Sequence, residues 1–103
     1  MMTSAYATAR IEEFQRDLSR RIAAHLQQNI EDFERLAVRL DSEIRTEEER
    51  TRNCDPTHVA YSMFAQAARA RRDNLRRSRD ELSLHLQSIQ AALDEVPEEQ
   101  RAA

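Results

Sequence analysis

The stretch from Arg52 to Thr57 is the one strong break in the first 96 residues of the chain, and it limits the fold more than any other feature. Pro56 has no amide hydrogen and its ring clashes with the carbonyl four residues back, so it cannot lie inside a helix but fits a first helical turn. Asp55 can cap such a turn, and Ser62 is a second helix-start signal a few residues later. Because the break lies near mid-chain, we expect two long helices joined by a turn.

The composition excludes most other folds. The 103 residues contain no glycine and two prolines, so hairpin turns between strands and glycine-rich phosphate loops are not expected. Charged residues make up 34% of the chain, and two helices alone bury only a narrow seam, so a partner is expected. A single cysteine, the lack of a secretory signal and the lack of a long apolar run predict a cytoplasmic protein.

An apolar residue recurs every three or four positions in both halves, which is the pattern of amphipathic helices. In the first half the average spacing is about 3.67 residues, closer to an eleven-residue repeat than to a heptad, which predicts a nearly straight pair of helices. The first stripe comprises Ile11, Phe14, Leu18, Ile22, Leu26, Ile30, Phe33, Ala37, Leu40 and Ile44. The second comprises Phe64, Ala68, Arg71, Leu75, Ser78, Leu82, Leu86, Ile89, Leu93 and Val96.

The two stripes match in reverse order, as an antiparallel hairpin requires. Facing residue numbers add up to 108 for the pairs nearest the turn and to 107 for the pairs farthest from it, which centres the fold-back on Cys54. Near the turn the pairs include Ile44 with Phe64 and Leu40 with Ala68. We therefore predict an all-α, antiparallel two-helix coiled-coil hairpin in one unit, 1–103. Its parts are helix one at about 9–51, the turn at about 52–57, helix two at about 58–96 and a loose tail at 97–103.

Several apolar residues cannot all face a single two-helix seam, and they predict a second contact surface. They are Leu36, Val38, Val59, Tyr61, Met63 and Leu84. The sequence leaves two uses of this surface open: self-association, as a homodimer or four-helix bundle, and docking of a different protein.

Catalytic and metal-binding patterns are not found. The three histidines, His25, His58 and His85, have no ligand partner at the spacing that a zinc site needs. Acidic pairs such as Glu12 and Glu13 lie away from the stripe, on faces where carboxylates are solvated. A thin hairpin also offers no concave site. We therefore expect no enzyme, no metal and no cofactor.

Arginines cluster in the second half, facing acidic residues of the first half. The favoured interpretation is an ion-paired surface, followed by docking of an acidic protein through Arg69, Arg72 and Arg76. Nucleic acid is the least favoured partner, because no aromatic residues interleave with the arginines and the net charge is −3. The cluster consists of Arg69, Arg71, Arg72, Arg76, Arg77 and Arg79.

The more specific motifs lie around the turn: the Asp-Pro pair, Tyr61 and Phe64 three residues apart, and the run Arg-Arg-Asp-Asn-Leu at 71–75. The segment DPTHVAYSMFAQAARARRDNL, with FQRDLSRR and IEDFERLAVRLDSEI before it and SRDELSLHLQSIQAALDEV after it, resembles the flagellar export protein FliJ family. The likeness is closest to the short alphaproteobacterial branch and covers roughly residues 10–96.

This resemblance implies a non-enzymatic coiled-coil component of the flagellar type III export apparatus, at its cytoplasmic base. Members of the family are similar to the stalk of rotary ATPases, sit in the ring of the export ATPase, contact the cytoplasmic domain of the export gate and escort export chaperones. The residues implied in gate contact fall on Tyr61, Phe64 and Ala68. Longer members continue helix two beyond the position of Pro97. The alternative is a self-associating structural or adaptor coiled coil unrelated to secretion.

Overall fold

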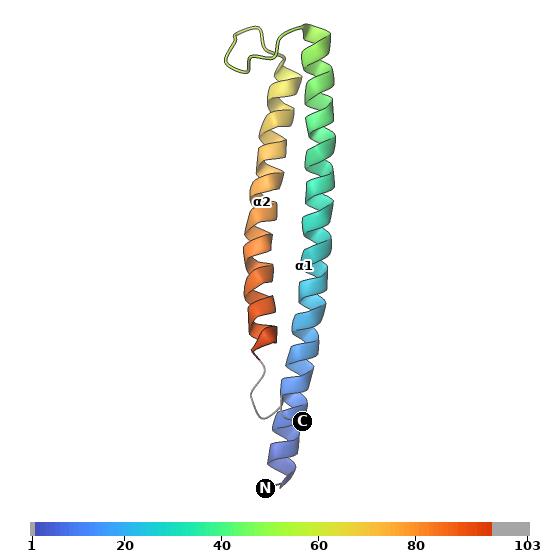
Figure 1. Ribbon diagram of the computed structural model, residues 1–103, viewed down its shortest axis with the longest axis vertical. Helices are drawn as coiled ribbons and strands as arrows, with labels where there is room; N and C mark the ends of the chain where they lie inside the picture. The colour runs from blue at the N-terminus through green and yellow to red at the C-terminus, as the bar shows by residue number, and fades with distance from the viewer. Residues whose placement is uncertain (1, 96–103) are drawn as a thin grey trace.

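A computed structural model describes residues 2–95, which form two long helices lying side by side in opposite directions (Figure 1). Helix α1 spans Met2–Thr51 and α2 spans Met63–Asp94. The hairpin measures 75 × 19 × 18 Å, which is the length of one long helix and the width of two. The expected all-α antiparallel hairpin is confirmed.

The helix boundaries differ from those expected. Helix α1 already begins at Met2, seven residues before the expected start at about 9. Helix α2 begins at Met63 instead of about 58, because Ser62 is its N-cap: the Ser62 side chain accepts a hydrogen bond from the Ala65 amide at 3.2 Å. The turn therefore extends to Ser62 and does not end at 57. The expected last residue of helix two, Val96, and the tail 97–103 lie outside the described residues.

Hydrogen bonds from short polar side chains stabilise the turn, which contains no glycine. Arg52 leaves α1 in the left-handed region, with φ of 55°. Asp55 Oδ1 accepts hydrogen bonds from the Thr57 amide at 3.0 Å and the Thr57 hydroxyl at 2.6 Å. These bonds keep the pKa of Asp55 below its usual value. Asn53 and His58 make similar local bonds to the amides of Asp55 and Ala60, so polar contacts shape this part of the turn.

The core is a single line of residues between the helices. Leu40, Ile44 and Ala68 form its buried cluster, against which Leu75 packs. Leu40 and Ala68 were expected to face each other. Near the turn the buried residues in each half of the chain are separated by three and four residues, which is a spacing typical of a coiled coil. They are Leu26, Ala37, Leu40, Ile44, Tyr61, Ala65, Ala68 and Leu86.

Toward the start of α1 the apolar stripe leaves the seam, contrary to expectation. Side-chain exposure is 41% at Ile22, 45% at Leu18 and 67% at Phe14, and Ile11 is also exposed. Much of these side chains, which were expected to pack against Leu86, Ile89 and Leu93, is therefore left uncovered by α2. The physical reason is the spacing: a stripe with a period of about 3.67 residues drifts around the helix relative to a seam that repeats every 3.5.

The seam of α2 near the turn is displaced by one residue from the predicted stripe. Ala65 is fully buried, whereas Phe64, expected opposite Ile44, is 57% exposed. Arg72 is half-buried and Arg71 is exposed, the reverse of the expected arrangement. Tyr61, expected off the seam, is buried. The small residues Ala65 and Ala68 are buried in the seam, and the larger Phe64 lies at its edge.

Candidate docking surfaces of the hairpin

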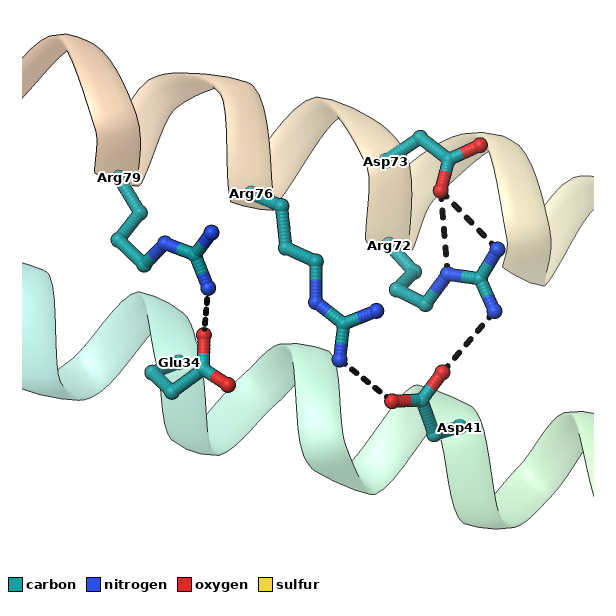
Figure 2. A network of polar contacts seen from close by, with 6 residues as sticks. All are labelled: Glu34, Asp41, Arg72, Asp73, Arg76 and Arg79. Atoms are coloured by element: carbon teal, nitrogen blue, oxygen red, sulfur yellow. Dashed lines mark hydrogen bonds and ion pairs between the residues drawn. The ribbon is translucent and has the colours of Figure 1, made fainter.

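One edge of the seam is a ladder of polar contacts between the helices (Figure 2). Glu34, Asp41 and Glu48 of α1 lie seven residues apart and accept hydrogen bonds from α2 and the turn before it. Their donors are Arg79 for Glu34, Arg72 and Arg76 for Asp41, and the Tyr61 hydroxyl for Glu48. Because Arg72 and Arg79 of α2 are also seven residues apart, the ladder opposes sliding of one helix along the other.

Asp41 is the centre of the charged part of this ladder, which we call the ionic edge; it comprises Glu34 and Asp41 with Arg72, Arg76 and Arg79. Arg72 Nη1 donates to Asp41 Oδ1 at 2.9 Å and Arg76 Nη2 donates to Asp41 Oδ2 at 2.5 Å. Burial by itself raises the pKa of Asp41, but the hydrogen bonds and positive charges of the two arginines outweigh it, so the pKa lies below 3.8. Arg72 also donates to Asp73, so its guanidinium joins two acids.

Three arginines of the cluster, Arg72, Arg76 and Arg79, thus form ion pairs across the hairpin, as the ion-pair interpretation predicted for the cluster as a whole. Their acidic partners on α1 are Asp41 and Glu34. Arg69 lies near the Tyr61 hydroxyl, where its charge partly offsets the effect of Glu48 on the pKa of Tyr61. The exposed guanidinium of Arg77 donates to Asn74. Docking of an acidic protein through Arg69, Arg72 and Arg76 stays a prediction, and it would compete with Asp41 for two of the three.

Tyr61 is a structural residue of the turn end. Its side chain is only 6% exposed, and its hydroxyl donates to Glu48 Oε2 at 2.9 Å. Burial, with the nearby Glu48 carboxylate, raises the pKa of Tyr61. A partner of the closed hairpin therefore meets little of the Tyr61 ring. The spacing of four and then three residues to Ala65 and Ala68 is the signal in the sequence that places Tyr61 in the seam.

The exposed apolar residues at the turn end are Val59, Met63 and Phe64, which we call the hinge surface. Beside Phe64 is a shallow groove of about 160 Å³, whose walls include Leu40 and Ala68. Ala68 itself is 6% exposed and forms part of the groove floor. Of the three residues implied in gate contact, Phe64 alone presents a large apolar surface.

The end of the hairpin away from the turn holds a larger groove of about 460 Å³ between α1 and α2. Its walls are mostly polar, with Glu12, Gln15 and Ser19 from α1 facing His85 and Ile89 from α2. Among the described residues there is no group of three or more His, Cys, Asp or Glu side chains placed to hold a metal ion. Within the same part of the chain, neither helix is apolar enough over a sufficient length to cross a membrane.

Comparison with known protein families, with curated proteins and with solved structures finds no match for this chain. A functional proposal therefore depends on the surfaces of the hairpin and on the likeness noted around Asp55 to Leu75. Of these surfaces, the hinge surface coincides with the segment that carries the likeness.

Proposed function

We propose that the chain is a non-enzymatic coiled-coil component of a flagellar type III export apparatus, located at its cytoplasmic base. In this role it couples the export ATPase to the cytoplasmic domain of the export gate and escorts export chaperones. The resemblance at residues 55–75 motivates the proposal. The antiparallel hairpin fits the shape that the resemblance implies.

The observation that carries the proposal is the difference in exposure between the two neighbouring aromatic residues, Tyr61 and Phe64. Tyr61 is buried and bonded to Glu48, and it fixes the end of the hairpin. Phe64, one turn further along, is more than half exposed beside Met63. An exposed aromatic ring on a rigid helix is the kind of residue that often contributes most of the binding energy in a protein interface. The hinge surface is therefore suited to docking.

Coupling between partners needs a rod that keeps its register when pulled or twisted. The ionic edge supplies this, because Asp41 holds Arg72 and Arg76 while Glu34 holds Arg79. The hairpin is 75 Å long, so a partner bound at the hinge surface and a partner bound at the far end are separated by most of that length. The hairpin can thus contact two partners that do not touch each other.

The test is a pull-down of the purified chain with its cognate export ATPase and gate cytoplasmic domain. Phe64→Ala is expected to weaken gate binding by about tenfold or more, as loss of an aromatic anchor does. Leu84→Ala is the control, since Leu84 is also a large, exposed apolar residue of α2 but is not part of the hinge surface. Circular dichroism of both variants should match the wild type, because neither side chain is in the core.

Two results would contradict the proposal. If the wild-type chain binds neither the ATPase nor the gate domain, and a deletion strain swims normally, the export function is wrong. If both partners bind but Phe64→Ala binds the gate as tightly as the wild type, the hinge surface is not the docking site.

A further inference from the structure

The four apolar residues that leave the seam near the start of α1 form a surface of their own. We call Ile11, Phe14, Leu18 and Ile22 the open-end stripe; all four are exposed. Each directly precedes a residue that lines the groove toward α2 or is half-buried in the seam. One residue corresponds to about 100° around a helix, so the stripe faces roughly a quarter turn away from α2. The residues that follow those of the stripe are Glu12, Gln15 and Ser19, which line the groove, and the half-buried Ala23.

The open-end stripe exposes a continuous line of apolar side chains. Four large side chains that are 41% to 67% exposed leave on the order of 400 Å² of apolar surface in one line. That is as large as the biggest apolar patch of a typical monomeric protein, and such patches mark contact sites. The width of the stripe is that of one helix, which indicates a helical occupant.

The charges beside the stripe are complementary to those of a second copy. Asp17 and Arg21 lie on one border of the stripe, four residues apart, and both are exposed. If two stripes cross antiparallel with Leu18 at the two-fold axis, Phe14 lies opposite Ile22 of the second copy. The same alignment sets Asp17 near Arg21 of the second copy, and the symmetry repeats each contact.

The geometry also matches a bundle. A helix in a four-helix bundle packs against two neighbours, on faces about a quarter turn apart. Helix α1 has two such faces, the seam toward α2 and the open-end stripe. We infer that two copies of this chain pair through their open-end stripes, with the α1 helices antiparallel. The interface buries on the order of 1,000 Å² with its flanking residues, so the dimer is weak and reversible.

The pairing is independent of the proposed role in export, since it uses the other end of the hairpin from Phe64. Cysteine cross-linking tests it directly because Cys54 is the chain's one native cysteine. In a Cys54→Ser background, Leu18→Cys is expected to form a disulfide-linked dimer readily, because a residue at the two-fold axis meets its own copy. The matched control is Val38→Cys, which is as exposed as Leu18 but on the other side of α1.

The mass of the uncross-linked chain completes the test. By light scattering at about 100 µM, wild type is expected to show dimer and Phe14→Asp monomer, with unchanged helicity in both. Asp17→Arg should weaken the dimer and the double variant Asp17→Arg, Arg21→Asp should restore it.

Three outcomes overturn the inference. If the wild-type chain stays monomeric at that concentration, the open-end stripe does not bind a second copy. A dimer that persists in Phe14→Asp would place the interface elsewhere. Cross-linking of Leu18→Cys no faster than that of Val38→Cys would exclude the two-fold axis at Leu18.

Discussion

Replacing Leu40 with alanine is expected to lower the free energy of unfolding by about 2–4 kcal/mol, because it removes apolar atoms from the best-packed part of the seam. Leu40 is 9% exposed and belongs to the one buried cluster found among the described residues, with Ile44 and Ala68. A thin hairpin has no second layer that could move into the cavity. Urea denaturation followed by circular dichroism at 222 nm measures the change.

Leu84→Ala is the matched control, because it removes the same atoms from a residue of α2 that is 68% exposed. Its expected cost is below about 0.5 kcal/mol, as for most surface substitutions. Equal losses in the two variants would show that Leu40 is not in a packed seam and that the hairpin does not close as described.

The second large effect is expected at Asp41. Asp41→Asn should lower the free energy of unfolding by about 1–2 kcal/mol near neutral pH, because two partly buried arginines lose their shared carboxylate. The side chain of Asp41 is 27% exposed and that of Arg72 is 16% exposed, so this pair is screened less than a surface pair. Asp17→Asn, which breaks the exposed pair with Arg20, should cost only about 0.3–0.5 kcal/mol.

The pH dependence of the Asp41 effect has a definite sign. The pKa of Asp41 is lower in the folded hairpin than its usual value of 3.8, so folding favours the ionised carboxylate. This contribution is complete above the unfolded-state pKa and is lost as the pH falls through the lower, folded-state pKa. The difference between wild type and Asp41→Asn should therefore be constant from about pH 5 to about pH 7, roughly one pH unit or more above the unfolded-state pKa, and shrink below pH 3.8. A difference that grows on acidification would contradict the ionic edge.

Sequence patterns are sufficient for the architecture because it depends on coarse features. Pro56 predicts the turn, and the absence of glycine favours a long helix on each side of it. The apolar stripes match in reverse order, which predicts that Leu40 lies against Ala68, and both belong to the buried cluster. Ser62 is recognisable as a start signal, yet Pro56 favours a first turn and so predicts an earlier start near 58. The local bonds of Asp55 and His58 use those residues in the turn instead.

The surfaces are harder to predict because hydrophobicity alone does not mark the seam. In a two-helix hairpin the seam is narrow, so adjacent residues can differ greatly in burial. Ala65 is fully buried, whereas the more hydrophobic Phe64 next to it is 57% exposed. Strict steps of four and three from Tyr61 through Ala65 and Ala68 identify the seam. The seven-residue spacing of Glu34 and Asp41 against Arg79 and Arg72 carries the same information.

The separation of the seam from the apolar stripe at the start of α1 is the central claim, since the inferred dimer depends on it. Two double-cysteine variants in a Cys54→Ser background test it in dilute solution, where contacts between copies are suppressed. One pairs Ser19→Cys with Ile89→Cys, two positions that line the same groove; the other pairs Leu18→Cys with Ile89→Cys. We predict a rapid intramolecular disulfide in the Ser19 variant and little in the Leu18 variant, and the opposite ranking would show that Leu18 faces α2.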